Sequence, residues 1–260
     1  MYSQRKEKKT MNVMIFDTET ISIDKPFCYN IGYVIMRTED GAILKTADYI
    51  VEQVWHNKML FSTAYYADKR PRYILAMRKR EAKLNKYGHI CQAMAADIKN
   101  YEVKYAFAFN SSFDERVFDF NCDWFKCNNP LETVPVYDIR GYAHHYICDN
   151  VYKKWCEENE KFSESGNYSS TAESVYQFLI QNTDFEEAHT ALADSKIEST
   201  ILYVCLLNGA KIDGDYKPYR SLTRNVKKSF QVKLNKEIIF EKEVCGIRYM
   251  KNDNTIILKE

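Results

Sequence analysis

The chain has 260 residues, of which 45% are hydrophobic and 28% are charged, values typical of a soluble globular protein and not of a disordered one. Its 37 basic and 36 acidic side chains give a net charge of +1, which excludes a highly basic surface as the whole basis of any nucleic-acid binding. No apolar stretch long enough for a signal peptide or a membrane-spanning helix is present. We therefore expect a cytoplasmic protein whose eight cysteines are reduced.

The first part of the chain is predicted to open with strands. The apolar run over 11–16 is typical of a strand buried on both faces, and the patterns over 28–37 and 41–51 predict two more strands joined by a turn. Helices are then expected over 68–86 and 91–102, before another buried strand over 105–109.

The next elements alternate between helix and strand. A helix over 113–120 is followed by a short strand over 134–138, a helix that begins at Ile139, and strong helices over 171–179 and 192–207. An antiparallel meander followed by alternating helices and strands indicates an α/β fold, with a mixed sheet that is covered by helices.

The pattern changes after residue 208, where strands are predicted over 229–234, 237–244 and 255–258. The division predicted from these patterns is a basic tail at 1–10, a main domain at 11–210 and a small basic, β-rich appendage at 211–260. The main domain is acidic between two basic ends, which suits carboxylates in the body and a polyanion at the flanks, although a solvated surface explains the same pattern.

Carboxylates fall at the ends of these predicted elements. Asp17 and Glu19 end the first strand, and their spacing places both side chains on one face. Asp114 follows the strand at 105–109, near the start of a helix that Asn110 or Ser111 could cap. Grouped carboxylates repel one another, and a divalent cation with oxygen ligands is the simplest compensation. Each motif alone is also typical of an ordinary turn or helix cap.

A third motif lies near residue 190. His189 precedes the last long helix, and Asp194 lies about one turn into it. A histidine beside the start of a helix is more often structural than catalytic. The third motif is informative only together with the other two, because the three in combination are far more specific than any one of them.

The order Asp17-x-Glu19, Asn110-x-x-x-Asp114 and His189-x-Ala191-Leu192-x-Asp194 resembles that of the DEDDh 3′–5′ exonucleases. This family includes the proofreading epsilon subunit of bacterial replicases, RNase T and oligoribonuclease. The resemblance covers about residues 11–207, and it implies an RNase H-like fold and phosphodiester hydrolysis with two Mg²⁺ or Mn²⁺ ions. Ile21-Ser22-Ile23 departs from the family's Thr-Gly-Leu-like continuation, which leaves the packing contact with the 3′ end open.

The resemblance also implies roles for single residues. Asp17, Glu19 and Asp194 are expected to bind one ion, Asp17 to bridge to a second, and Asp114 to act partly through water. His189 is expected to be the general base. The expected contacts with the 3′ end are the neighbours of the carboxylates, namely Thr18, Thr20, Ile21 and Asn110.

A basic segment at 69–86 is the candidate for contacts farther along the strand. It holds eight Lys and Arg residues against one Glu, and Tyr65, Tyr66 and Tyr73 lie close by, a combination that suits a single-stranded track. We expect Arg78, Lys79 and Arg80 to contact substrate. A lid, a partner surface or plain solvation is the alternative.

These inferences favour an exonuclease that acts on single-stranded DNA, with a polymerase or other replication protein as a possible partner and no membrane association. The alternatives are an RNA-trimming exoribonuclease or oligoribonuclease, and a module that binds nucleic-acid ends without hydrolysis.

One stretch invites a zinc interpretation that its spacing does not support. It holds Cys122, Cys127, His144, His145 and Cys148. The intervals match no compact zinc pattern, so reduced and partly buried thiols are expected there.

Overall fold

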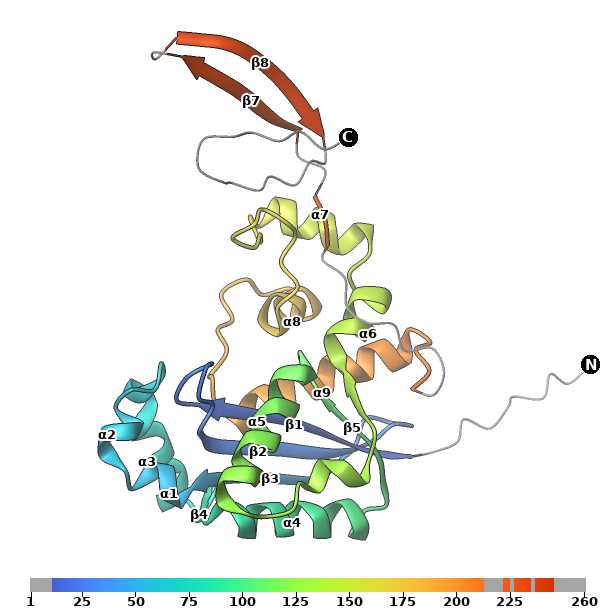
Figure 1. Ribbon diagram of the computed structural model, residues 1–260. Coiled ribbons are helices and arrows are strands. Elements are labelled where there is room, and N and C mark those ends of the chain that lie inside the picture. The colour runs from blue at the N-terminus through green and yellow to red at the C-terminus, as the bar shows by residue number, and fades with distance from the viewer. Residues whose placement is uncertain (1–10, 213–221, 225–226, 235–236, 246–260) are drawn as a thin grey trace, which may run out of the picture.

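The computed structural model describes residues 11–212, 222–224, 227–234 and 237–245, and it describes side chains up to Arg224. A six-stranded sheet with the order β4-β3-β2-β1-β5-β6 forms the centre of the main domain (Figure 1). Its strands are β1 (Asn12–Thr20), β2 (Cys28–Arg37), β3 (Ile43–Val51), β4 (Lys83–Asn85), β5 (Val103–Ala108) and β6 (Val136–Asp138).

The pairing confirms the predicted mixed sheet. β1, β2 and β3 form the expected antiparallel meander, whereas β5 runs parallel to β1 and β6 runs parallel to β5. β1 lies in the middle of the sheet, and its residues 13–16 are wholly buried, as the apolar run predicted. The end of β1 therefore extends from a buried part of the sheet that is paired on both sides.

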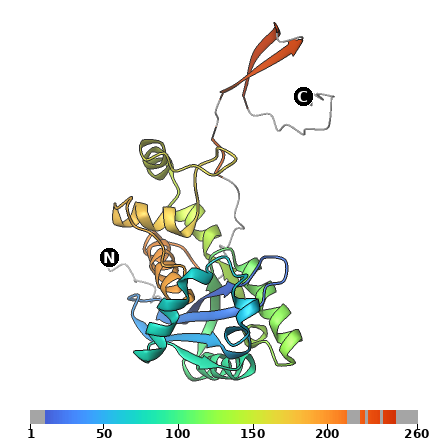
Figure 2. The ribbon, with the colours of Figure 1, turned by 90° about the vertical axis from the view of Figure 1, so that its left-hand side faces the viewer.

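Helices cover both faces of this sheet (Figures 1 and 2). On one face, α4 (Tyr87–Asn100) and α5 (Ser111–Phe125) pack on a core that includes Met14 and Phe16 of β1. On the other face, α9 (Ala191–Leu207) and α6 (Ile139–Tyr146) pack on Val13 and Ile15. This split follows from strand geometry, because successive side chains point to opposite faces.

The second layer is extended by α7 (Asn150–Glu158) and α8 (Ala172–Ile180). The sequence analysis missed α7, although Asp149 caps it by accepting hydrogen bonds from two backbone N–H groups. Its buried side chains Tyr152, Trp155 and Cys156 also recur at helical spacing. The signal was therefore present in the sequence.

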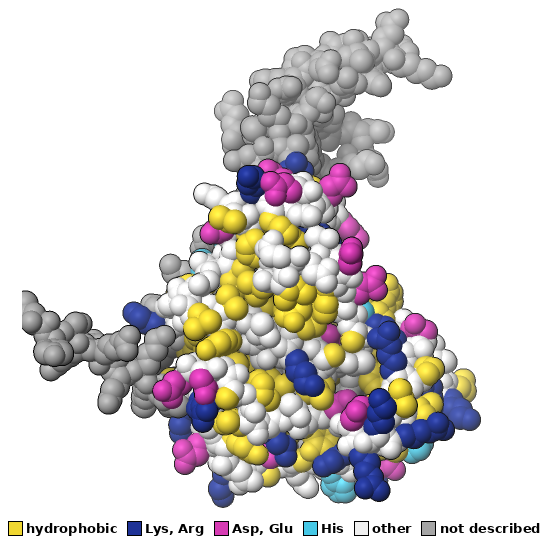
Figure 3. Space-filling model, turned by 180° about the vertical axis from the view of Figure 1, so that it is seen from behind, with side chains coloured by type: hydrophobic (Ala, Val, Ile, Leu, Met, Phe, Trp, Pro, Cys, Tyr) yellow, Lys and Arg dark blue, Asp and Glu magenta, His cyan; other side chains and the backbone are white. Residues whose placement is uncertain are grey.

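The predicted helix over 68–86 is confirmed only for its first half, and its extent is wrong. The segment after β3 forms α1 (Glu52–Trp55), α2 (Lys58–Phe61), the 3₁₀ turn η1 (Ala67–Lys69) and α3 (Arg70–Arg78). The chain then turns at Arg80, whose φ is +63°, and β4 pairs parallel with β3. Edge pairing and the burial of Ala82 outweigh the helical propensity of the basic residues. Lys and Arg side chains gather where this segment lies, on the lower right of Figure 3.

The stretch with cysteines and histidines does not form one group. Cys122 and Cys127 belong to the α4–α5 side of the sheet, whereas Cys148 belongs to the core under α6. His144 and His145 lie on α6. A short 3₁₀ turn, η2 (Pro130–Thr133), lies between the two parts.

Two further strands are described near the C-terminal end. β7 (Lys227–Leu234) and β8 (Glu237–Cys245) pair antiparallel, at nearly the positions predicted for the first two late strands. The strand expected at 255–258 and the basic tail at 1–10 lie outside the described residues. The division into three parts therefore stays a prediction. Within the described chain, no helix is long and apolar enough to cross a membrane.

Gly32 of β2 sets the position of α9. A Cβ atom at residue 32 would lie 2.0 Å from the backbone nitrogen of Leu192, so only glycine lets the helix approach this closely. Two hydrogen bonds fix the contact: Ser195 Oγ donates to the Gly32 carbonyl at 3.0 Å, and the Ala191 N–H donates to Asn30 Oδ1 at 2.9 Å. Because Gly32 pairs with Asp17, the first turn of α9 lies beside the end of β1.

Candidate active site

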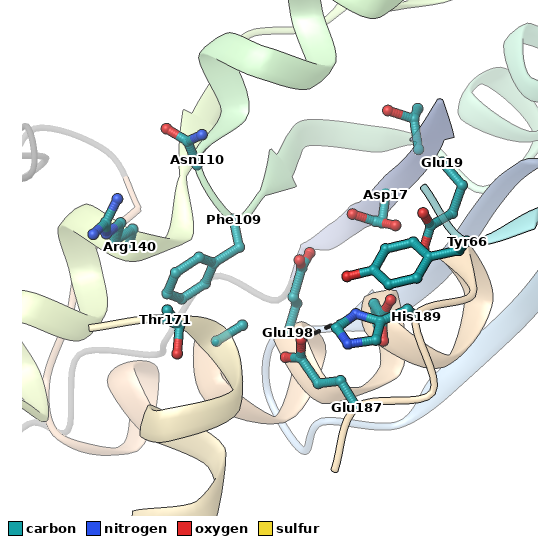
Figure 4. A pocket seen from close by; sticks show the side chains of 13 residues that line it. Asp17, Glu19, Tyr66, Phe109, Asn110, Arg140, Thr171, Glu187, His189 and Glu198 are labelled. Carbon is teal, nitrogen blue, oxygen red and sulfur yellow. Dashed lines mark ion pairs between the residues drawn. The ribbon is translucent and has the colours of Figure 1, made fainter. Parts of the chain in front are cut away.

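A cavity of about 330 Å³ opens where β1 meets the start of α9 (Figure 4). Most of its lining side chains are polar or charged, whereas a gap left by imperfect packing of the core would be lined by apolar side chains. The lining residues are Asp17, Thr18, Glu19, Tyr66, Phe109, Asn110, Arg140, Thr171, Ala172, Glu187, His189, Asp194 and Glu198.

Three of the predicted carboxylates meet at this cavity. Carboxylate oxygens of Asp17, Glu19 and Asp194 lie within 4.8 Å of one another. Asp194 Oδ1 is buried and has no hydrogen-bond partner among the described residues. Oxygen ligands grouped in this way suit a hard divalent cation such as Mg²⁺.

Asp114 lies behind this group and does not line the cavity. Its side chain is 3% exposed, and Thr18 Oγ1 donates a hydrogen bond of 2.6 Å to its Oδ1. The fourth predicted carboxylate is therefore near Asp17 but packed on the α5 side. The Thr18 hydroxyl is engaged with Asp114, although Thr18 also lines the cavity.

The pKa values of the carboxyl groups record the cost of this arrangement. Burial, followed by repulsion from Glu187 and Glu19, raises the pKa of Asp194 to about 8. Burial is also the largest cause for Glu19 and Asp114, whose pKa values rise to about 7. The pKa of Asp17 is raised well above its ordinary value by burial and by neighbouring carboxylates. Without a cation, the group is short of positive charge.

His189 is held between an aromatic ring and a carboxylate. Its imidazole stacks on the Tyr66 ring at a centroid distance of 4.5 Å and an interplanar angle of 12°, and its Nδ1 lies 3.8 Å from Glu187 Oε2. Burial, and then the charge of Lys69, lowers its pKa. The imidazole is therefore neutral at neutral pH, the state that can accept a proton.

Basic side chains anchor the loop that carries His189. Lys69 Nζ and an Arg72 guanidinium nitrogen donate to the Ala188 carbonyl at 3.0 and 3.1 Å. Lys69 also lies 4.1 Å from the centre of the Tyr66 ring. This outside support holds His189 with a φ of +49°, a left-handed conformation that is uncommon for a residue other than glycine.

The other end of α3 has no such contact with the cavity. Arg78, Lys79 and Arg80 are exposed and do not line it. The basic segment thus contributes its first residues to the site, where the sequence analysis expected the later ones to contact substrate.

The remaining predicted contacts are distributed unevenly. Thr20 Oγ1 donates to the Ser22 carbonyl at 3.2 Å, and Ile21 is 6% exposed and packs in the core. Ile23, by contrast, is 71% exposed. Of these three residues, none lines the cavity.

Asn110 does line the cavity, at the start of α5. Its side chain does not cap the helix, so the capping expected of Asn110 is wrong. The backbone adopts a φ of +67°, and the N–H donates to Asp138 Oδ1 at 2.8 Å. Ser111 does not cap the helix either. Asn110 occupies the N-cap position, and the Ser111 hydroxyl donates a hydrogen bond to the Glu115 carboxylate. The exposed Asn110 amide remains available at the rim.

Sequence reasoning missed two further carboxylates of the cavity. Glu198 is 3% exposed, and its Oε2 has no hydrogen-bond partner among the described residues. It lies one helical turn after Asp194, so the i,i+4 spacing on α9 could have revealed it. Glu187, beside His189, lies within the third motif itself. Figure 4 shows Glu198 between Asp17 and Glu187.

Comparison with known proteins finds a shared structure without a sequence match. No family model matches the chain, and no curated protein does. A 3′-exonuclease that recognises the 3′ end of a histone mRNA stem-loop aligns with a TM-score of 0.52 and 14% identity, covering 76% of this chain and 82% of that one. Exonuclease I in a complex with SSB-Ct aligns with a TM-score of 0.50 and 11% identity, covering 76% of this chain and 42% of that one. The nuclease domain of 3′hExo, a DEDDh family member, aligns with a TM-score of 0.49 and 16% identity, covering 78% of this chain and 94% of that one.

The first two alignments show that the main domain has the fold of 3′-exonucleases. The expected resemblance to the DEDDh exonucleases is confirmed at the level of the fold, which is the RNase H-like mixed sheet with antiparallel opening strands.

Proposed function

We propose that this chain is a metal-dependent 3′–5′ exonuclease, which hydrolyses phosphodiester bonds from the free 3′ end of a nucleic acid. The observation that carries the proposal is the meeting of Asp17, Glu19, Asp194 and His189 at one cavity. They come from distant parts of the chain, and the fold around them is that of known 3′-exonucleases.

The carboxylates that line the cavity fit one divalent cation, and the resemblance to the DEDDh exonucleases implies a second. Asp17, Glu19 and Asp194 would hold one ion, and Asp17 together with Asp114 would hold the second, partly through water. The buried, unpartnered oxygens of Asp194 and Glu198 favour a positive charge here. When bound, Mg²⁺ or Mn²⁺ neutralises charge on the phosphodiester and lowers the pKa of an attacking water.

His189 would accept the proton of that water. Glu187 faces Nδ1, so it favours the tautomer with a proton on Nδ1 and leaves Nε2 as the acceptor. Tyr66 fixes the plane of the ring, and Lys69 and Arg72 fix the loop beneath it. The lowered pKa keeps the base unprotonated at neutral pH.

The walls of the cavity suit the end of a single strand. Phe109 offers an aromatic face for stacking a base, and Arg140 and Asn110 lie on the same side of the cavity as Phe109 (Figure 4). Single-stranded DNA is the favoured substrate, and RNA is the alternative. The choice depends on the fit around the terminal 2′ position.

The test is degradation of 5′-labelled single-stranded DNA, double-stranded DNA and RNA, each with Mg²⁺ and with EDTA. We expect stepwise shortening from the 3′ end and release of mononucleotides only with the metal. The Asp17→Asn variant is the matched control. Binding of 3′ ends by the wild type without any cleavage in Mg²⁺ or Mn²⁺ would identify a binding module instead.

A further inference from the structure

Three cysteines from separate segments meet on the face of the sheet opposite α9. Cys91 lies in the first turns of α4, Cys122 in the last turns of α5, and Cys127 just after the end of α5. We call these three residues the thiol cluster. Cys91 Sγ lies 3.9 Å from Cys122 Sγ and 4.0 Å from Cys127 Sγ, and all three sulfur atoms lie within 4.8 Å of one another.

These distances are close to those of a tetrahedral metal site. Zinc–sulfur bonds of about 2.3 Å in tetrahedral geometry place the sulfur atoms about 3.8 Å apart. A disulfide would require about 2.05 Å, and all three residues carry free thiols. The cluster thus presents one triangular face of a tetrahedron.

The surroundings of the cluster favour the entry of a cation. Cys122 and Cys127 line a cavity of about 380 Å³ whose other charged residues are Asp119, Asp123, Glu132 and Lys126. Lys126 is paired with Asp123 at 2.9 Å, so the cavity is acidic overall. A path from solvent to the sulfur atoms is one requirement for a metal site.

We propose that Cys91, Cys122 and Cys127 bind a thiophilic divalent cation such as Zn²⁺, with the fourth position open to this cavity and filled by water. Each thiol that coordinates the metal releases its proton to solvent. The site is separate from the carboxylate cavity and does not depend on the proposed nuclease activity.

The cation would join two helices that otherwise meet through apolar contacts. It would fasten the start of α4 to the C-terminal end of α5, whose N-terminal end carries Asp114. We therefore expect its main effect on stability. At a free Zn²⁺ concentration of 100 Kd, the Tm should rise by about 5–10 °C.

The experiment uses the full chain, reduced and stripped of metal, and titrates it with Co²⁺ as a spectroscopic probe. Cobalt bound to thiolates gives a sulfur-to-metal charge-transfer band, whereas cobalt bound by the carboxylate cavity does not. We expect this band to saturate at one equivalent and to disappear when Zn²⁺ is added. Cys91→Ser, Cys122→Ser and Cys127→Ser should each weaken it, while Cys205→Ser, a buried thiol in the other core, should leave it unchanged.

The titration of the wild-type chain decides the matter even if a variant fails to fold. A folded wild type without the charge-transfer band would overturn the proposal. A band that survives in all three folded variants would overturn it too. A mass loss of two hydrogens under mild oxidation, without any metal-dependent band, would identify the cluster as a disulfide-forming pair instead.

Discussion

The carboxylate cavity and the thiol cluster lie on opposite faces of one sheet, and the ionisable groups that they bury differ in acidity: the cavity holds carboxyl groups, whereas the cluster holds thiols, which ionise only at higher pH. The cavity gathers carboxyl groups whose charges repel one another, and it leaves oxygens of Asp194 and Glu198 without partners. In the thiol cluster, hydrogen bonding to Cys122 and burial raise the pKa of Cys91, so that thiol stays neutral. Burying a neutral group costs little free energy, whereas burying an unpaired charge costs much more. The contrast suggests that changes in the cavity act mainly on activity and changes in the cluster mainly on stability.

The largest loss of activity is expected from Asp17→Ala. Asp17 faces Asp114, Glu19, Asp194 and Glu198, so its removal should abolish cation binding and reduce turnover by more than the ~10²–10³ typical of one lost electrostatic contact. The Tm of the metal-free protein should stay unchanged or rise, because repulsion is relieved. Calorimetry and a cleavage assay measure the two effects. A folded variant with near-normal turnover would refute the assignment of the metal site.

His189→Ala should lower kcat by about 10²–10⁴, the usual range for a general base. Cation binding should largely survive, because the carboxylates are unchanged. The loss should shrink at high pH, where hydroxide replaces the base. His89→Ala, at an exposed position, is the matched control. An equal loss at every pH would indicate a structural role for His189.

Glu198→Gln keeps the shape of the side chain and removes its charge. We expect the affinity for Mg²⁺ to fall by about 10–100-fold, the range for a group that supports the ligands. The metal-free protein should gain stability. Glu186→Gln, at an exposed position of the same motif, is the control. Unchanged affinity, measured by titration calorimetry, would separate Glu198 from the cation site.

The two ends of the basic segment provide a finer comparison. Lys69→Ala should slow cleavage of a dinucleotide and of a long strand alike, because Lys69 supports the loop of His189. Reversing Arg78, Lys79 and Arg80 to Glu should weaken binding of long strands only and flatten its salt dependence. Two measurements distinguish these variants: filter binding of a long strand at increasing salt concentrations, and the rate of cleavage of a dinucleotide. Equal loss on both substrates after the reversal would point to misfolding or to a lid.

The smallest effect is the pH dependence of stability without metal. The folded pKa values of Asp194 and Glu19 are about 8 and about 7, above their unfolded values of about 4. Their contribution to stability is therefore complete below pH ~4 and is lost as pH rises through 7 and 8. The Tm in EDTA should fall across this range, and less so in Asp194→Asn. Saturating Mg²⁺ should remove the fall. A wild-type slope equal to that of the variant would contradict the raised pKa values.

The sequence predicted the elements with strong periodic patterns and missed features that depend on tertiary contacts. The buried run of β1 and the long helix α9 were found because their patterns are clear, and residues from all three motifs line the candidate cavity. β4 was missed because edge pairing, and not local propensity, makes it a strand. Tyr66 and Lys69 were noticed in sequence, but their stacking and anchoring around His189 involve residues more than a hundred positions away. No local pattern encodes such contacts.

The anchoring of His189 also has a consequence for the synthesis of the protein. The Ala188 carbonyl is held by residues 119 and 116 positions earlier, and Ala191 is held by Asn30 across 161 positions. A nascent chain on the ribosome therefore contains Asp17 and Glu19 long before it contains the residues that complete the cavity. The candidate active site can assemble only once α9 has emerged and docked on Gly32. Any nuclease activity of this chain would thus be withheld from its own messenger RNA until translation of the main domain is finished.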